Sequence, residues 1–166
     1  LRPSLPLEQS LTAIGGAIRE ATPFQVNVIS EVNPDTMMLE RVCSTGLPTE
    51  QWADLQKRTQ QWESIQQLLL PEFRFGSVYF IPVDKSPVLP QDVYTITVTK
   101  ESDTRGGTDA WQPDDFLLVP LYDSNNFPLG LISVDAPTDG RRPDRPTFEA
   151  LEIFGIQAAL MIENHR

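Results

Sequence analysis

The chain has 166 residues, of which 40% are hydrophobic, and this length and composition suit a single domain with a substantial core. Its formal net charge of −10, with only 13 basic residues, excludes the electrostatic footprint of a protein that binds nucleic acid or an anionic membrane surface. No apolar run approaches membrane-spanning length, and the single cysteine, Cys43, indicates a reducing, cytoplasmic setting because it cannot form an internal disulfide.

A helix is predicted over residues 4–22. Ser4 is a suitable N-cap, and aliphatic residues follow at helical intervals: Leu7, Leu11, Ile14 and Ile18. This spacing is typical of a helix that packs on a sheet and of a helix that packs against a partner helix, so the sequence leaves both arrangements open. Because the sequence lacks an initiator Met and begins just before this helix, we expect a fragment of a longer polypeptide.

Two strands are predicted next, over residues 24–31 and 37–45. Apolar and polar residues alternate in the first, and the turn-forming residues 33–35 separate the two, which favours an antiparallel pair. Cys43 falls late in the second strand with no second cysteine or histidine nearby. We interpret it as a small buried hydrophobic residue.

A helix over residues 49–70 follows, beginning at Thr49 and stopped by Pro71. A break near residues 58–60, which would give two shorter helices, is the alternative. The large apolar residues share one face, and this predicts a helix that covers the sheet in preference to a cofactor site: Trp52, Leu55, Trp62 and Leu69.

Residues 77–83 form a predicted strand, after which the pattern weakens as far as residue 109. Within that stretch, residues 94–99 alternate as a further strand would. A connection of this length in a compact domain usually serves binding. Trp111, Asp114 and Asp115 follow it; packing and turn formation are their first interpretation, and ligand contact is the second.

The strongest pattern lies in the last third of the chain. Apolar runs over residues 115–122 and 128–135 flank a polar turn and predict a hairpin, with Asp135 assigned to turn formation at its end. A helix over residues 145–165 then carries two apolar stripes, which require two partners. One stripe is Phe148, Leu151, Gly155, Ala158 and Ile162, and the other is Ile153, Ile156 and Leu160. The sheet accounts for one stripe, and the other is open to the N-terminal helix, to a second copy, or to both.

Several blocks of sequence resemble GAF domains, small sensory modules of bacterial signalling proteins such as sensor histidine kinases and diguanylate cyclases. The blocks are residues 46–48, 71–74, 79–82, 115–121, 129–135 and 151–164. The resemblance covers nearly the whole chain and implies a single α+β domain over residues 1–166. Its expected fold is a six-stranded antiparallel sheet with the N- and C-terminal helices on one face. Shorter helices and loops would roof a small-molecule pocket on the other.

The special chemistries of the family fit this sequence poorly. Bilin- and haem-binding members use a pocket cysteine or histidine, whereas Cys43 lies in a strand and the only histidine, His165, precedes the last residue. We therefore predict no cofactor and disfavour bilin and haem. The cyclic-nucleotide signature does not align, and one cysteine cannot support methionine sulfoxide reductase chemistry. No catalytic triad, phosphate loop or metal-ligand spacing is present, so we expect no enzymatic activity.

Two functions therefore compete. In the first, the domain is a sensory module that binds an unidentified small molecule and relays the signal through its terminal helices to an output domain of the same chain. The predicted ligand-binding residues are Tyr79, Phe80, Tyr94 and Trp111. In the second, the domain binds no ligand, and its terminal helices form a homodimer that relays the signal. A third hypothesis is an enzyme whose chemistry lies outside the known motifs.

Overall fold

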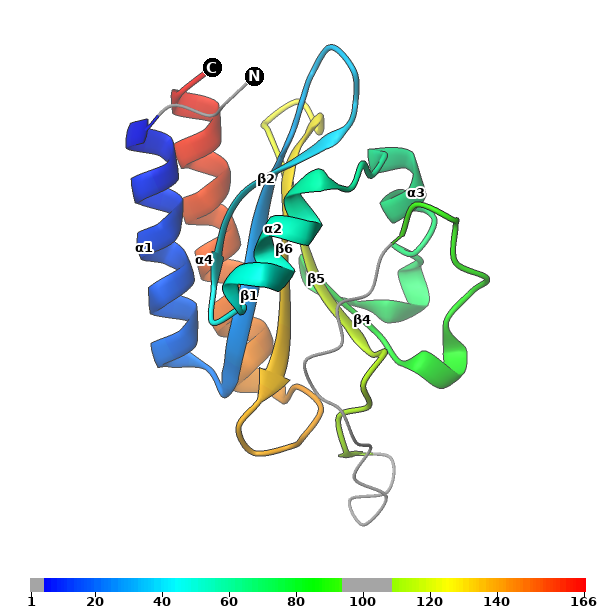
Figure 1. The fold of residues 1–166 in the computed structure, drawn as a ribbon. Helices are drawn as coiled ribbons and strands as arrows, with labels where there is room; N and C mark the ends of the chain where they lie inside the picture. Colours follow the sequence, from blue (N-terminus) through cyan, green and yellow to red (C-terminus); the bar gives the residue numbers. More distant parts are fainter. Residues whose placement is uncertain (1–4, 94–108) are drawn as a thin grey trace.

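The computed structural model describes residues 5–93 and 109–166, which form three layers around one sheet (Figure 1). Helices α1 (Leu5–Ala21) and α4 (Arg145–Asn164) lie side by side on one face. Helices α2 (Thr49–Lys57) and α3 (Trp62–Gln66) lie over the opposite face. The start of α1 and the end of α4 are at the same end of the molecule, so these two helices run antiparallel.

The sheet contains six strands in the order β2-β1-β6-β5-β4-β3, and every neighbouring pair is antiparallel. The strands are β1 (Phe24–Val32), β2 (Leu39–Thr45), β3 (Arg74–Phe75), β4 (Val78–Ile81), β5 (Phe116–Tyr122) and β6 (Pro128–Pro137). Short 3-10 helices at Pro71–Phe73 and Val83–Lys85 flank β3 and β4. The structure confirms the predicted α+β fold with a six-stranded antiparallel sheet.

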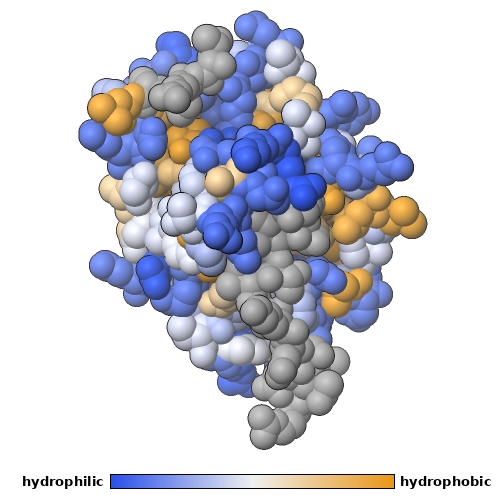
Figure 2. Space-filling model, viewed as in Figure 1, coloured by the Kyte–Doolittle hydropathy of each residue, from blue (hydrophilic) through white to orange (hydrophobic). Residues whose placement is uncertain are grey.

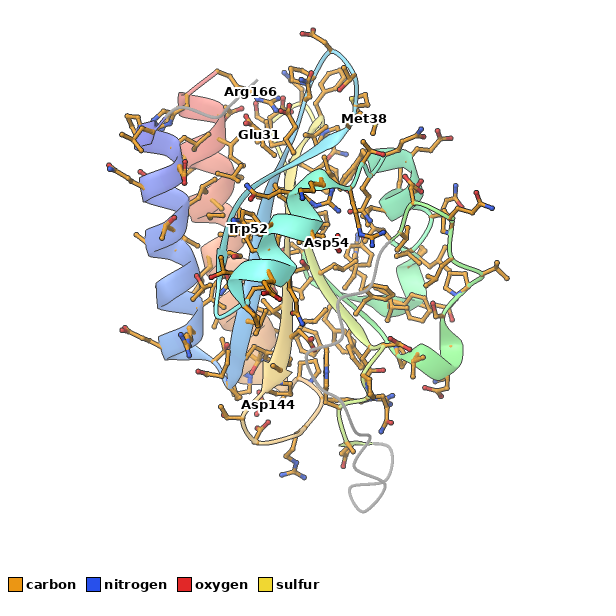
Figure 3. All side chains as sticks on the ribbon, in the orientation of Figure 1. Glu31, Met38, Trp52, Asp54, Asp144 and Arg166 are labelled. Atoms are coloured by element: carbon orange, nitrogen blue, oxygen red, sulfur yellow. The ribbon has the colours of Figure 1, made fainter. Side chains whose placement is uncertain are left out.

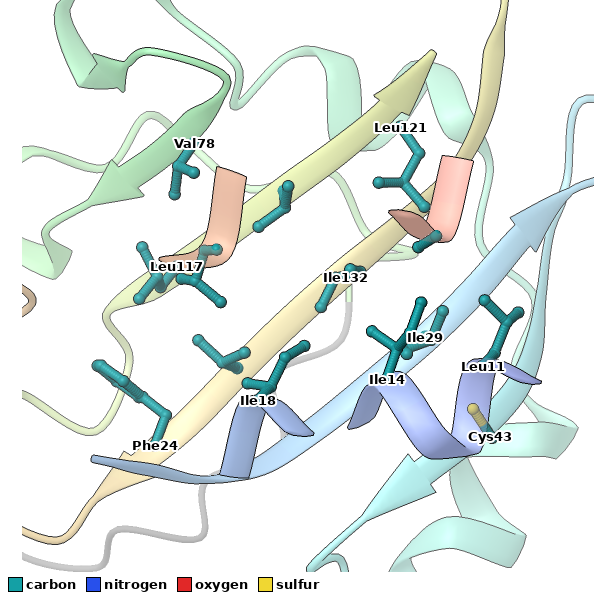
Figure 4. Close-up of a cluster of buried hydrophobic side chains, with 14 of the residues drawn as sticks. Leu11, Ile14, Ile18, Phe24, Ile29, Cys43, Val78, Leu117, Leu121 and Ile132 are labelled. Atoms are coloured by element: carbon teal, nitrogen blue, oxygen red, sulfur yellow. The ribbon is translucent and has the colours of Figure 1, made fainter. Parts of the chain in front are cut away.

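An apolar layer joins α1 and α4 to the sheet. Leu11, Ile14 and Ile18 of α1 point toward the sheet and join Ile29 and Cys43 of the strands in one buried cluster (Figure 4). The same layer contains one of the two stripes predicted for α4, formed by Phe148, Leu151, Gly155, Ala158 and Ile162. Burial of these stripes against one face of the sheet determines where both helices lie.

A second apolar layer lies on the other face. Trp62 and Ile65 of α3, with Leu68 just beyond it, pack there on Leu118 and Leu131 of the sheet. Leu117, Val119 and Leu121 of β5 belong to the first layer, so this strand is covered on both faces, as its nearly continuous apolar run predicted.

The predicted hairpin of β5 and β6 is present, and Gly130 permits its close packing against β1. A Cβ atom at Gly130 would collide with the backbone oxygen of Ser30 on the neighbouring strand. Pro120 is tolerated within β5 because β4 pairs with β5 only as far as Leu118. Beyond that point, the edge of β5 away from β6 has no strand partner among the described residues, so the missing N–H of Pro120 breaks no pairing on that side.

The prediction of one helix over residues 49–70 was wrong, and the alternative of a break is confirmed. The intervening backbone hydrogen-bonds with the start of β2 instead of continuing the helix. The Leu39 N–H donates to the Gln60 oxygen at 2.8 Å, and the Trp62 N–H donates to the Met37 oxygen at 3.0 Å. These bonds satisfy backbone groups that a continuous helix would have satisfied internally.

Smaller differences concern strand ends. β2 begins at Leu39, not at residue 37, because Met37 has a φ of +59°, outside the range of extended strands. β4 ends at Ile81, since the following Pro82 removes a backbone donor. The short exposed strand β3 was not predicted, because two exposed residues carry no alternation. The predicted strand over residues 94–99 lies outside the described residues.

The second stripe of α4 is not covered within the described part of this chain. Ile153, Ile156 and Leu160 are 57%, 61% and 53% exposed. The helix is therefore buried on only one of its two apolar sides in the single chain. The other side faces solvent.

One face of the molecule is mainly polar, and both ends of α4 are tied down. The face seen in Figure 2 is dominated by hydrophilic residues, with hydrophobic ones in small separate areas. Asp144 caps the start of α4 by accepting from the Thr147 N–H at 3.1 Å. At the opposite end of the molecule, Arg166 pairs with Glu31 at 3.4 Å (Figure 3).

Candidate functional site

A cavity of about 100 Å³ lies on the face of the sheet opposite α1 and α4. Strands β1, β6 and β5 form its floor, while β2, α2, residues near α2 and the segment before β5 form its walls. The floor includes Val26, Val28, Ser30, Leu118, Leu131 and Ser133; the walls include Arg41, Leu47, Leu55, Gln60, Pro113, Asp114, Asp115 and Asp135. Apolar side chains thus alternate with a small number of polar groups, as in many small-molecule sites.

Strand register explains this mixture. Side chains two apart on a strand share a face, so alternate residues of β1 and β6 meet above the floor. The three facing pairs are Val26 with Asp135, Val28 with Ser133, and Ser30 with Leu131. Asn27, between Val26 and Val28 on β1, points to the other face, where its amide donates to the Gly15 oxygen of α1 at 2.9 Å.

Arg41 brings a positive charge to one end of the cavity. It lies opposite Ser30 in the β1–β2 pair. Its guanidinium donates to the backbone oxygen of Arg58 at 2.9 Å and to Gln60 Oε1 at 3.0 Å. Burial lowers the pKa of Arg41, and the nearby Asp92 carboxylate opposes that change. Both hydrogen-bond acceptors are neutral, and no carboxylate within residues 5–93 and 109–166 forms an ion pair with this group.

Asp115, in the wall at the other end, is held by four hydrogen bonds. Its carboxylate accepts from Arg142 Nε at 2.9 Å and Nη2 at 3.1 Å. It also accepts from the backbone N–H groups of Val83 and Gln112, each at 2.8 Å. Arg142 makes a longer contact of 3.4 Å with Asp84. The buried Asp115 carboxylate therefore joins three segments of the chain: Val83 after β4, Gln112 before β5 and Arg142 before α4.

Asp135 links the cavity wall to the apolar layer beneath the terminal helices. Its Oδ1 accepts from Trp111 Nε1 at 2.9 Å. The Trp111 ring is buried and packs edge-on against Phe24, with ring centroids 5.1 Å apart. Phe80 lies 6.0 Å from Trp111, and Arg142 Cζ lies 5.4 Å from the centroid of the Phe80 ring. The two sides of the sheet are thus connected around its end.

The aromatic residues predicted to bind ligand take different positions. Tyr79 is half-buried against the layer that contains α3, whereas Phe80 and Trp111 meet each other in the layer beneath the terminal helices. These three are not among the residues that line the cavity, and Trp111 is linked to it through Asp135. Tyr94 lies outside the described residues. Direct ligand contact by the four aromatic residues stays a prediction.

Sequence reasoning missed Arg41, Ser30 and Ser133 as cavity residues and assigned Asp135 to a turn. One signal was available, because Ser133 and Asp135 are polar residues at alternate positions of a strand predicted to be buried. Arg41 offered no such signal. A charged residue in a strand ordinarily faces solvent, and only the placement of the segment after α2 half-buries this one.

A second hollow, of about 360 Å³, lies between α4 and the unpaired edge of β5. Pro120 and Tyr122 form its strand side, and Gly155, Ile156 and Leu160 form its helix side. It borders the exposed stripe of α4. An exposed apolar surface of this kind is typical of protein contacts.

The cysteine and the histidine, which serve as metal or cofactor ligands in other proteins, lie apart from the cavity. Cys43 is buried on the α1 side, where burial raises the thiol pKa to about 11. His165 is exposed at the end of α4 and donates from Nδ1 to the Met161 oxygen at 2.7 Å. In the described ranges, no three His, Cys, Asp or Glu residues are placed to hold a metal ion. The helices of those ranges include none long and apolar enough to cross a membrane.

Solved structures share this fold over nearly the whole chain. The GAF domain/HD domain protein from Geobacter sulfurreducens superimposes with a TM-score of 0.67 at 12% sequence identity, covering 96% of this chain and 93% of that one. The GAF domain of a two-component sensor histidine kinase from Bacillus halodurans gives a TM-score of 0.58 at 13% identity, covering 97% and 95%.

An enzyme has a similar structure as well. Free methionine-R-sulfoxide reductase from Neisseria meningitidis, solved with its substrate, gives a TM-score of 0.59 at 12% identity and covers 96% of this chain and 80% of that one. No model of a protein family and no curated protein matches the sequence. At these identities, the similarity to solved structures establishes the fold alone.

Proposed function

The chain has the GAF fold, and from that premise we propose that it is a sensory or regulatory module that binds a small molecule in the cavity. In this proposal the ligand changes the packing of α1 and α4, which pass the signal to an output domain in the same polypeptide. A cytoplasmic location is part of the proposal, because a lone free cysteine suits a reducing compartment.

The observation that carries the proposal is the bond network between the cavity wall and α4. Asp115 lines the cavity and is held by Arg142, which lies two residues before Asp144, the N-cap of α4. A ligand that displaces the segment around Asp115 therefore acts on the start of that helix through a short charged contact. This geometry supports coupling between the cavity and a terminal helix.

The relay works as a shift between two populations of helix arrangement. A ligand changes that balance only by binding one arrangement better than the other, and a coupling of about 1–3 kcal/mol is enough for a useful switch. In this proposal, Asp115 and Asp135 make the ligand's affinity differ between the two helix arrangements. Each lines the cavity and also contacts a residue outside it, Arg142 for Asp115 and Trp111 for Asp135.

Catalysis is not part of the proposal. The one free cysteine is buried on the α1 side of the sheet, away from the cavity, and its raised pKa of about 11 keeps it as an unreactive thiol. The described residues that line the cavity supply carboxylates, hydroxyls and one guanidinium, and no histidine beside a nucleophile. We propose that any enzymatic output belongs to another domain.

A ligand screen with a blocked cavity tests the proposal. Purines, cyclic nucleotides, flavins and amino acids are screened by native mass spectrometry and thermal shift. Any hit should lose binding in Ser133→Phe, which fills the cavity floor, and keep it in the matched control Thr138→Phe, where the side chain is exposed. A hit that binds both variants equally contradicts binding in the cavity. Absence of any hit, together with a cavity closed by the domain's own side chains in a crystal structure, contradicts the proposal as a whole.

The exposed stripe of α4 supports a second candidate function, a dimerisation and signal-relay domain that binds no ligand. Ile153, Ile156 and Leu160 follow at intervals of three and four, the spacing of a seam between two helices. The same helix in a second copy offers an identical stripe, so a two-fold axis can pair them. The hollow beside β5 extends the apolar surface available to such a partner.

Sedimentation velocity over a dilution series tests this candidate. Ile153→Asp should remain folded, because Ile153 is 57% exposed, and should remain monomeric at high micromolar concentration if the stripe forms the dimer. Gln51→Asp is the matched control, since it adds the same charge to an exposed position of α2 across the sheet. Wild-type protein that stays monomeric at the same concentration contradicts the dimer.

A further inference from the structure

We propose that the hollow between α4 and β5 binds an extended segment of a partner protein, which pairs as a further strand with the free edge of β5. The segment has apolar residues at alternate positions and basic residues at its ends. This inference goes beyond the proposed sensory function, because the site is separate from the cavity and needs no ligand there. It follows from the backbone groups along the edge of β5, the apolar side chains of the hollow and the charge around it.

Unpaired backbone groups of β5 border the hollow. The pairing of β5 with β4 ends at Leu118, opposite Tyr79, whereas its pairing with β6 continues to Tyr122. Alternate residues of an antiparallel strand direct their N–H and C=O groups to the same neighbour. Pro120 and Tyr122 therefore direct theirs to the side that β4 has left, where the described ranges supply no strand partner. An edge of this kind binds an extended segment by strand addition.

The side chains of the hollow favour apolar residues at every second position of that segment. An added strand directs alternate side chains to each face of the sheet, and those on the α4 face would enter the hollow. Leu121, Ile156 and Leu160 line it there. Ile156 and Leu160 are 61% and 53% exposed in the single chain, so apolar side chains of the segment would remove them from water. Pro120 lacks an N–H, so these contacts must add to the affinity of a short strand pairing.

The charge at one end of the hollow favours a basic partner. Asp123 at the end of β5 and Glu163 near the end of α4 line it, and none of its lining residues is Lys or Arg. Arg166, the cation closest to Glu163 along the chain, pairs with Glu31 instead. A Lys or Arg side chain at the end of the segment therefore meets complementary charge, whereas a second copy of this chain brings a net charge of −10.

The test uses a capped synthetic peptide of about eight residues, in which alternating valine and threonine are flanked by lysine pairs. Titrated into the protein, it should shift the Val119, Leu121 and Tyr122 amide signals in nuclear magnetic resonance spectra. It should bind about tenfold or more tightly than the same peptide with glutamates in place of the lysines. N-methylation of alternate amides in the valine–threonine core should also weaken binding by about tenfold or more, because it prevents strand pairing.

Two lysine substitutions in α4 test the position of the site. Ile156→Lys should weaken binding of the lysine peptide by about tenfold or more, because it removes an apolar contact and adds a like charge. Gln157→Lys is the matched control: it adds the same charge to the next residue, which is exposed and does not line the hollow, and should change affinity less than about threefold. Glu163→Gln should weaken binding by about twofold to fivefold.

Several outcomes overturn the inference. No binding at ~1 mM peptide, equal binding of the glutamate peptide, or equal affinity of Ile156→Lys and wild type contradicts the site. Binding that N-methylation leaves unchanged contradicts strand pairing. Peptide affinity that falls as the protein concentration rises, together with a dimer in sedimentation velocity, assigns the hollow to a second copy. None of these results concerns the cavity, so the sensory function stands or fails separately by its ligand screen.

Discussion

Gly15 determines how closely α1 approaches the sheet. A Cβ atom at this position would lie 2.6 Å from Thr45 Oγ1 and 2.7 Å from Asn27 Oδ1. Asn27 is fully buried, and its amide nitrogen donates to the Gly15 oxygen while its Oδ1 has no hydrogen-bond partner. The contact between helix and strand therefore requires a residue without a side chain.

Gly15→Ala should destabilise the domain by roughly 1–3 kcal/mol, because Asn27 and Thr45 must move to admit the methyl group. Gly16→Ala is the matched control: nothing lies within 4 Å of a Cβ there, and alanine favours the helix by up to about 1 kcal/mol. Urea unfolding followed by circular dichroism measures both variants. Equal stability of the two would show that packing at Gly15 is not limiting.

Asp115 accepts four hydrogen bonds in the cavity wall, and its loss removes the acceptor of two backbone N–H groups. Asp115→Ala should cost roughly 3 kcal/mol or more, since two backbone N–H groups lose their acceptor and Arg142 loses its shorter carboxylate contacts. Asp84→Ala removes the other carboxylate on Arg142, but Asp84 is 65% exposed, and the cost should stay within about 0.5 kcal/mol. Thermal unfolding by calorimetry compares them. A large effect of Asp84→Ala would contradict this division of roles.

Cys43 makes stability depend on pH in the alkaline range. Burial raises its thiol pKa from 9.0 to about 11, with smaller effects from Thr12, which lowers it, and Glu8, which raises it. The folded state therefore binds the thiol proton more tightly than the unfolded state. The resulting stability is fully present below pH 9 and is lost as the pH rises toward 11.

Urea unfolding of wild type and Cys43→Ala at several pH values isolates this contribution, because other titrating groups are common to both. Cys43→Ala should lose less stability between pH 9 and 11, and the difference should reach about 2–3 kcal/mol. The native thiol should also react slowly with iodoacetamide at about pH 8, where it is protonated. Parallel pH profiles of the two proteins would place the thiol in a solvated site.

At the scale of elements, α4 has two apolar faces, and only one of them is buried within the described part of the chain. Leu151 is fully buried between α4 and the sheet, whereas Ile153, two residues later, is 57% exposed. Burial of one face explains the position of the helix. The other face adds nothing to the stability of the single chain and remains available for a partner.

Alanine substitutions in α4 should therefore separate the two faces. Leu151→Ala should destabilise the folded monomer by about 2–5 kcal/mol through the cavity it leaves, and Ile153→Ala should change it by less than about 1 kcal/mol. Guanidinium unfolding at low protein concentration makes the comparison. A loss of several kcal/mol in Ile153→Ala under those conditions would show that this face packs within the chain.

At the scale of the whole molecule, the net charge of −10 acts against association of two copies. If the exposed face of α4 forms a dimer, salt should strengthen it by screening this repulsion, with tighter association at ~0.5 M than at ~0.02 M sodium chloride. Sedimentation equilibrium at both concentrations measures the change. Weaker association at high salt would indicate that ion pairs, and not the apolar stripe, hold the two copies together.

The fold class was implied by the resemblance to GAF domains. The patterns of the sequence itself determined both hairpins, the two terminal helices and the two apolar stripes of α4. These features depend on local periodicity, and the apolar runs of β5 and β6 leave little choice of structure. The aromatic residues chosen as a binding site were a weaker inference, because bulky side chains serve packing as readily as ligand contact.

Only the tertiary structure decided where the cavity lies and which polar groups face it. Arg41 and Asp135 are separated in the chain and come to one face through the pairing of β1 with both β2 and β6. The break between α2 and α3 arises in the same way, from backbone bonds to the start of β2. Such placements depend on contacts between distant segments, and no pattern within a single segment of this sequence records them.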